Sequence, residues 1–99
     1  MIVTYDLVKQ RDFGSFISDG EEYIIINEKP YFDSRYKGHN KQEFYRAAAI
    51  RLGDDIDNDG YATAYNVKWH YPNRIENTND VCDWNHPDEI TVNGSTKIL

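Results

Sequence analysis

Three aspartates at alternate positions carry the most suggestive chemistry in the chain. The stretch GDDIDNDGY, residues 53–61, places Asp55, Asp57 and Asp59 directly before Gly60. Carboxylate oxygens at such a spacing are the ligands that hard cations such as calcium prefer. The same residue types also form solvated turns, because Asp and Asn side chains bond their own backbone and Gly accepts left-handed geometry. Both a cation site and a plain turn are therefore predicted alternatives for this loop.

The loop resembles the opening of an EF-hand calcium loop over six residues. EF-hand ligands come from positions 1, 3, 5, 7, 9 and 12, with Gly at position 6. Counted from Asp55, this resemblance implies a calcium site made of Asp55, Asp57, Asp59 and the Tyr61 carbonyl. Position 12 falls on Asn66, which lacks the two-oxygen carboxylate of that family, and a strand pattern follows in place of a second helix. The turn is the leading prediction, and calcium binding is the alternative.

A thiol and an imidazole four residues apart form a second candidate site. Cys82 and His86 could bind zinc with His70 and His39, but the second Cys or paired His of a structural site is missing. A cysteine nucleophile needs a stabilised thiolate, and the carboxylates around Cys82 should raise its pKa instead. We therefore expect Cys82 or Trp84 to anchor its loop to the core. The sequence also has no Walker motif, nucleophile elbow or zincin motif, so a non-enzymatic protein is predicted.

Net charge is unevenly distributed along the chain. Residues 1–53 contain eight acidic and eight basic side chains, whereas residues 54–99 contain nine acidic and three basic ones and so carry the whole net charge of -6. An acidic half argues against direct binding to nucleic acid, whose phosphates need a basic surface. It favours a basic protein partner. The predicted contact residues are Asp54, Asp55, Asp57, Asp59, Glu76, Asp80, Asp83, Asp88 and Glu89.

In size, acidity and lack of catalytic motifs, the chain is similar to small phage and mobile-element inhibitors of host defence. This resemblance, to DNA-mimic anti-restriction and anti-CRISPR proteins, is one of composition and implies a partner that handles nucleic acid. Carboxylates displayed on a folded scaffold can imitate DNA, which carries one charge per roughly 1.7 Å of its axis. We therefore expect an acidic binding or inhibitor protein.

Alternating and turn-forming residues predict the strands that position these groups. Residues 3–7 alternate as a first strand, and Asp19-Gly20 between residues 11–18 and 22–27 predicts a hairpin with a type I′ turn. Residues 23–26 are apolar on both faces, which places them in the middle of a sheet. The clearest alternation is 61–71, a long strand with an aromatic face that we assign to the core. Residues 72–89 indicate a loop, and residues 90–92 a short closing strand.

One helix is expected over residues 41–52. Asn40 followed by Glu43 is typical of a helix start, and Gly53 suits the position after a helix end. Apolar side chains at helical spacing fall on one face between them. Residues 28–40, with Pro30 and Gly38, indicate a long connection that folds back onto the body.

Together these elements predict an α+β fold in which one helix packs on a mainly antiparallel sheet of four to five strands. A chain of 99 residues is the size of a single domain. One cysteine and the lack of a long apolar run favour a soluble, cytoplasmic protein without a membrane span or resident cofactor.

Overall fold

Five antiparallel strands follow one another as a meander in the computed structural model, which describes residues 1–70 and 82–99. The sheet order is β1-β2-β3-β4-β5. A short helix α1 (Tyr5–Val8) and a 3₁₀ turn η1 (Lys9–Arg11) precede it. The strands are β1 (Ser15–Ser18), β2 (Glu21–Lys37), β3 (Asn40–Arg51), β4 (Tyr61–His70) and β5 (Glu89–Lys97). The predicted α+β class with a mainly antiparallel sheet is confirmed, while the helix occupies a different place.

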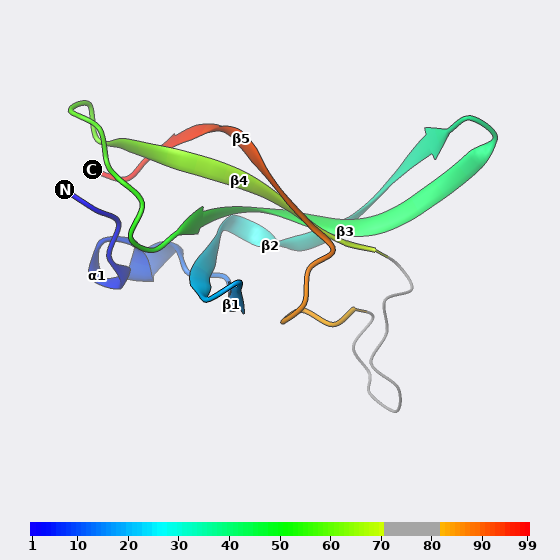
Figure 1. The fold of residues 1–99 in the computed structure, drawn as a ribbon, viewed down its shortest axis with the longest axis horizontal. Helices are drawn as coiled ribbons and strands as arrows, with labels where there is room; N and C mark the ends of the chain where they lie inside the picture. The colour runs from blue at the N-terminus through cyan, green and yellow to red at the C-terminus, as the bar shows by residue number, and fades with distance from the viewer. Residues whose placement is uncertain (71–81) are drawn as a thin grey trace.

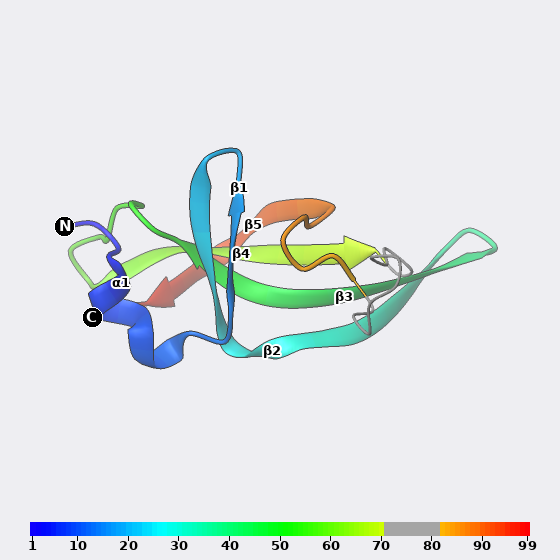
Figure 2. The same ribbon diagram turned by 90° about the horizontal axis from the view of Figure 1, so that it is seen from below.

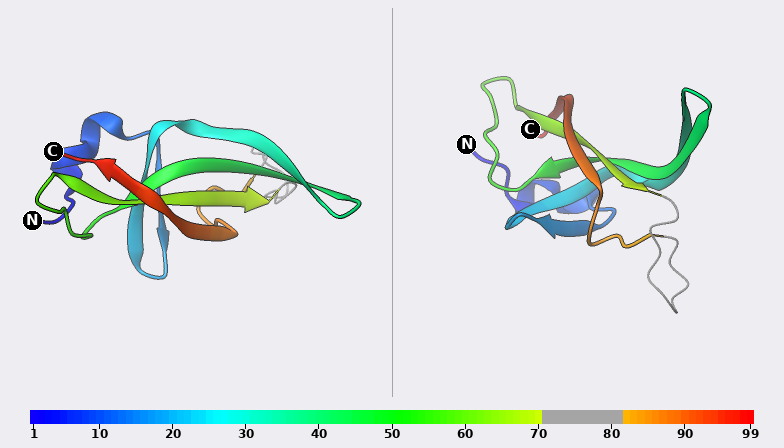
Figure 3. Two further views of the ribbon diagram at one scale, coloured as in Figure 1. Left: turned by 90° about the horizontal axis from the view of Figure 1, so that it is seen from above. Right: turned by 45° about the vertical axis from the view of Figure 1, so that its right-hand side comes forward.

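The curled sheet and the β2–β3 hairpin that extends from it give the molecule dimensions of 44 × 32 × 23 Å (Figure 1). The first hairpin, made of β1 and the start of β2, runs across β3 and β4 (Figure 2). Both termini lie at one end of the long axis, and the tip of the β2–β3 hairpin lies at the other (Figures 1 and 3). No helix among the described residues is long and apolar enough to span a membrane.

The predicted helix over residues 41–52 is wrong, because this segment is the central strand β3. Tyr45, Ala47 and Ala49 pack on one face of the sheet, and Ala48 and Ile50 pack on the other. A strand covered on both faces needs apolar residues at both parities, so its pattern resembles that of a buried helix. Tertiary packing overrides the helix preference of the alanines here.

The N-terminal segment forms α1 where a strand over residues 3–7 was predicted. Val3 and Val8 are buried, whereas the alternating Tyr5 and Leu7 are about half exposed. The strand-like pairing of this segment with the described residues is limited to one bridge between Ile2 and Asp55. The segment therefore covers a face of the sheet instead of joining it.

The expected connection over residues 28–40 is also wrong, since β2 continues to Lys37 and turns at Gly38 into β3. A register shift between Ile26 and Tyr31 accommodates Pro30, and Asn27 has a φ of +75°. Such a bulge bends a strand without ending it. Far from folding back, the hairpin projects as an arm (Figure 1).

The predicted first hairpin is confirmed, and so is the aromatic strand over residues 61–70. Tyr71 and residues 72–81 of the predicted loop lie outside the described residues. Asp19 and Gly20 have φ values of 51° and 78°, as a type I′ turn requires, and Ser18 pairs with Glu21. In β4, Tyr65, Val67 and Trp69 are buried in the core. The closing strand, predicted over residues 90–92, is longer and runs through Glu89–Lys97.

Two core clusters lie on opposite faces of the sheet. The first surrounds Trp69 and includes Cys82, so the chain before β5 covers that face. The second surrounds Ile24, Ile26 and Ile50 and is covered by Val3 and Val8. The prediction that residues 23–26 lie in the middle of the sheet is confirmed, because Tyr23 and Ile25 face one cluster while Ile24 and Ile26 face the other.

Candidate functional site

Asp54, predicted to contact a partner, is largely covered, with 13% of its side chain exposed. One oxygen accepts a hydrogen bond from Arg51 Nε at 2.8 Å, and the other accepts one from the Tyr65 hydroxyl at 2.7 Å. Burial and this bond to Asp54 raise the pKa of Tyr65 to about 12. The same carboxylate, bonded to Arg51, raises the pKa of that guanidinium further. Asp54 therefore joins the end of β3 to β4 and has little surface left for a partner.

Asp57 organises the turn that follows. Its Oδ1 accepts hydrogen bonds from the backbone N–H groups of Asp59 and Tyr61, both at 2.9 Å. Its own N–H donates to the Tyr61 carbonyl at 2.8 Å, so that carbonyl oxygen already accepts a backbone hydrogen bond. Gly60 has a φ of +87°, and its carbonyl accepts from the N–H groups of Ile98 and Leu99. These contacts form the predicted turn and tie it to the C-terminal residues.

The structure does not gather the three aspartates into a cation site. In the described part of the chain, no three His, Cys, Asp or Glu side chains are grouped to hold a metal ion. The Asp57 oxygen and the Tyr61 carbonyl both accept backbone hydrogen bonds of the turn. Calcium binding by Asp55, Asp57, Asp59 and Tyr61 thus stays a prediction without a preformed site.

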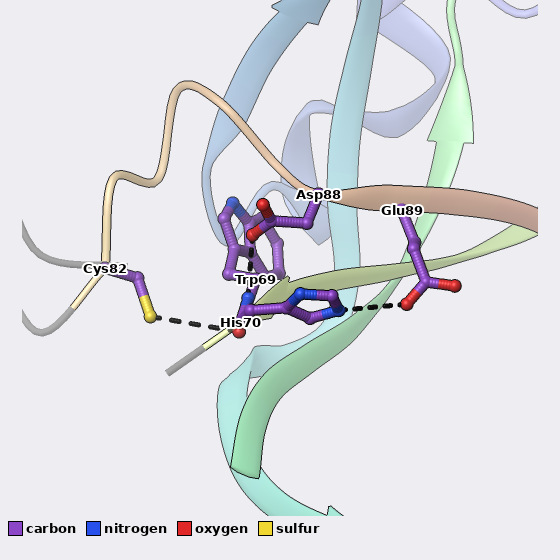
Figure 4. Close-up of polar contacts among 5 residues, drawn as sticks. All are labelled: Trp69, His70, Cys82, Asp88 and Glu89. Carbon is purple, nitrogen blue, oxygen red and sulfur yellow. Dashed lines mark hydrogen bonds and ion pairs between the residues drawn. The ribbon is translucent and has the colours of Figure 1, made fainter. Parts of the chain in front are cut away.

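The carboxylates before and at the start of β5 are engaged with histidines and backbone. Glu89 Oε2 lies 3.1 Å from His70 Nε2, and Asp88 Oδ2 accepts from the His70 backbone N–H at 2.8 Å (Figure 4). Asp83 Oδ2 lies 2.7 Å from His86 Nδ1. Glu76 and Asp80, also predicted to contact a partner, lie outside the described residues. The contacts of Asp88 and Glu89 join the start of β5 to the end of β4, whereas the contact of Asp83 is local.

Those predicted contact residues that the structure describes fall into two groups. Tyr61, next to the Asp57 turn, pairs with Lys97, while Lys68 pairs with Glu89. An extended strand rises about 3.3 Å per residue, so the two groups of carboxylates are roughly 23 Å apart along β4. Two separate acidic regions are therefore present in the described part of the chain, and only the region that holds Asp55, Asp57 and Asp59 keeps several exposed carboxylates without ion pairs.

Cys82 serves as an anchor, which confirms that prediction. It is fully buried beside Trp69, and its thiol lies 4.0 Å from the Trp69 carbonyl (Figure 4). Trp69 Nε1 in turn donates to the Trp84 carbonyl at 3.1 Å. Burial, with a smaller contribution from Asp88, raises the pKa of the Cys82 thiol. A buried thiol with a raised pKa is the opposite of an activated nucleophile.

A cationic arm is the surface that sequence reasoning missed. Residues 29–46 contain five basic side chains and two acidic ones. Both acids are paired within the arm, Asp33 with Arg46 at 3.2 Å and Glu43 with Lys41 at 3.8 Å. Lys29, Arg35 and Lys37 form no ion pair with any described residue. The cations around Gly38 are visible in the sequence, but the equal numbers of acidic and basic side chains in residues 1–53 hide this local excess of positive charge.

An apolar cavity of about 400 Å³ lies where the arm leaves the body. Phe13, Ile25, Pro30, Tyr45 and Trp84 form its walls, and Lys29 stands at its margin. Tyr45 and Trp84 meet edge to face with ring centroids 5.4 Å apart, and Trp84 meets Trp69 at 5.3 Å. The aromatic core of the first cluster therefore continues into the wall of this cavity.

Exposed acidic residues lie on the β1–β2 turn and on the β3–β4 loop, both of which are away from the tip of the arm (Figure 2). The Leu52 N–H donates to the Glu22 carbonyl at 2.9 Å, which brings the turn and the loop together. We define the acidic end as the exposed residues Asp19, Glu21, Glu22, Asp55, Asp57 and Asp59.

Comparison with known proteins identifies no family model, curated protein or solved structure that matches the chain.

Proposed function

We propose that the protein is a non-enzymatic binding protein whose acidic end contacts a basic surface of a partner protein. The observation that carries this proposal is the set of exposed carboxylates on the β1–β2 turn and the β3–β4 loop, none of which has an ion pair with another described residue. Lys29, Arg35 and Lys37, the cations of the arm without an ion pair to a described residue, lie away from the acidic end. At physiological salt, the Debye length is about 8 Å, so salt screens the cations of the arm from the acidic end and they offset little of its negative potential.

The partner that fits best is a protein that handles nucleic acid. Its basic groove is built to receive a row of phosphates, and a rigid row of carboxylates can compete for that groove. The hydrogen bonds of Asp57 hold the β3–β4 loop in one conformation, which lowers the entropic cost of binding. This form of the proposal makes the protein an inhibitor of the DNA-mimic kind.

Affinity capture with a charge-matched control tests the proposal. The bait is the intact protein, and the variant is Asp55→Asn/Asp57→Asn/Asp59→Asn, in which the amide that replaces the Asp57 carboxylate keeps an oxygen for the turn. The control Glu43→Gln/Asp83→Asn/Glu89→Gln removes three carboxylates elsewhere and changes the net charge equally. We expect the partner to be retained at roughly 50 mM salt and released at roughly 500 mM, as electrostatic binding requires.

The two variants give opposite expectations. The acidic-end variant should bind the purified partner at least about tenfold more weakly, a loss of roughly 1.4 kcal/mol. The control should bind as the wild type does. Equal weakening in both variants would mean that only net charge matters, and unchanged binding in the acidic-end variant would refute the proposed surface.

A further inference from the structure

The outer edge of β2 is open over most of the arm. β1 pairs with residues Glu21 to Ile24, and the backbone bonds of Phe13 and Gly14 to Ile25 extend this pairing by one residue. Beyond Ile25, no described strand lies on this side of β2, which continues to Lys37. An unpaired strand edge presents backbone donors and acceptors that another extended chain can pair with.

The cavity lies at the point where this edge becomes free. Phe13, Gly14 and Ile25 form the last paired contacts, and the same residues line the cavity together with Pro30 on the far side of the bulge. Pro30 has no N–H to leave unpaired, which suits an edge position. A chain added to the edge would therefore pass directly over an apolar cavity large enough for one side chain.

The charges along this edge determine which kind of peptide could pair with it. Lys29 stands beside the cavity, and Arg35 and Lys37 follow on β2, two residues apart and so on the same face of the strand. Asp33 lies between them and the cavity but is paired with Arg46 at 3.2 Å. The edge thus offers three cations without an ion pair to a described residue, and cross-strand pairs of opposite charge stabilise a sheet.

We propose that the free edge of β2 binds an extended acidic peptide of a partner protein by strand addition. The peptide backbone pairs with residues 31–37, an apolar side chain of the peptide fills the cavity, and its carboxylates lie opposite Lys29, Arg35 and Lys37. This is a known mode of peptide recognition, in which the backbone supplies affinity and the pockets supply specificity. The site is separate from the acidic end and does not rest on the function proposed for that end.

Two other occupants fit the edge less well. A second copy paired antiparallel through residues 31–37 would place Lys37 opposite Tyr31 and Arg35 opposite Asp33, whose carboxylate is already paired with Arg46, so it supplies no free acid for these cations. Nucleic acid would use the cations but neither the backbone edge nor the apolar cavity. Both occupants remain outcomes of the test.

A labelled synthetic peptide tests the proposal with the full-length protein. The probe is an extended peptide of about ten residues that alternates Glu with Val and Thr and carries one Phe near an end, a length matched to this strand. The comparison probes replace each Glu with Lys, or are a single-stranded oligonucleotide of similar length. Fluorescence anisotropy gives affinities, and amide exchange reports which backbone N–H groups become protected.

We expect the acidic peptide to bind at least about tenfold more tightly than the basic one and to protect amides within residues 31–37. Arg35→Glu/Lys37→Glu should weaken binding at least about tenfold, whereas the charge-matched control Lys9→Glu/Lys97→Glu should not. Phe13→Asn, on the exposed cavity wall, should weaken binding of the Phe-containing peptide more than that of a peptide with Ala in its place.

Any of four results would overturn the proposal. These are equal binding of the acidic and basic peptides, binding without protection of residues 31–37, tighter binding of the oligonucleotide, and protection of the edge by dimer formation in the absence of peptide. Loss of binding in the acidic-end variant alone would concern the function proposed above and leave this inference intact.

Discussion

The Tyr65 hydroxyl donates a 2.7 Å hydrogen bond to Asp54 and so connects the core of β4 to the start of the acidic loop. Arg51 holds the other oxygen of the same carboxylate at 2.8 Å and lies over the Tyr65 ring. The three residues come from β3, from the loop and from β4. Their contacts leave Asp54 only partly exposed, while the aspartates that follow it are exposed.

Tyr65→Phe should destabilise the protein because it removes a hydrogen bond to a charged group. Such bonds contribute about 1.5–3 kcal/mol, and Arg51 still pairs with Asp54, so we expect a loss of about 1.5 kcal/mol. Urea unfolding measures this loss. Tyr61→Phe is the matched control, since Tyr61 is partly exposed and its change should stay within about 0.5 kcal/mol. An equal loss in both variants would contradict the role of the Asp54 bond.

Stability should fall at alkaline pH through Tyr65. Its pKa is raised to about 12 in the folded protein from the ordinary value of 10.0. A raised pKa means that the folded state favours the protonated hydroxyl, so this contribution is complete below pH 10 and is lost as the pH rises toward 12. The difference in unfolding free energy between wild type and Tyr65→Phe should therefore shrink over that interval. A constant difference would argue against the shift.

Asp57 should matter more to stability than its neighbours. Asp57→Ala leaves the N–H groups of Asp59 and Tyr61 without their acceptor, and we expect a cost of about 1–2 kcal/mol. Asp57→Asn keeps an oxygen and should cost less. Asp55→Ala is the control and should be close to neutral, because the side chain is exposed. Thermal or urea unfolding of the three variants decides the matter.

Calcium should leave the loop unchanged at about 1 mM, a concentration at which weak protein sites are occupied. The reason is that Asp57 Oδ1 and the Tyr61 carbonyl already accept backbone hydrogen bonds. Amide NMR shifts of residues 55–61 during a calcium titration of metal-free protein provide the measurement. Saturable shifts confined to those residues would show that the turn opens to bind the ion.

Cys82 should be inert in the folded protein. Its side chain is fully buried, and burial raises the pKa of the thiol, so few thiolates are available. A thiol reagent should react about a hundredfold more slowly under native conditions than in urea, because reaction requires local opening. Rapid native labelling would reopen the hypothesis of a reactive cysteine with His86.

Local patterns predicted those parts of the fold in which neighbouring residues decide the structure. The Asp19-Gly20 turn, the alternation along β4 and the turn around Asp57 all depend on backbone preferences and on contacts close in sequence. Each was therefore readable without the rest of the chain. The anchoring role of Cys82 was predictable because a small apolar side chain in a polar loop, close to Trp84, tends to be buried in the core.

The errors arose where distant segments decide the structure. A helix was predicted in place of β3 because the apolar residues of this strand pack on both faces of the sheet. The sequence does not show that the N-terminal segment covers one face and the chain around Cys82 covers the other. The second arm of the hairpin was predicted to end at residue 27 because Pro30 and Gly38 indicate a connection. In the structure, a bulge between Ile26 and Tyr31 accommodates Pro30 at the open edge of β2.

Composition and local backbone chemistry were enough to specify an acidic, sheet-rich chain with a turn at the aspartates, because neither property depends on distant contacts. Which charges meet was set by folding alone. The folded chain places Asp54 against Arg51 and Tyr65, divides the remaining described carboxylates of the second half between the two ends of β4, and extends Arg35 and Lys37 on an arm away from the acidic end. Strand pairing sets these distances, and pairing joins residues that are far apart in the chain.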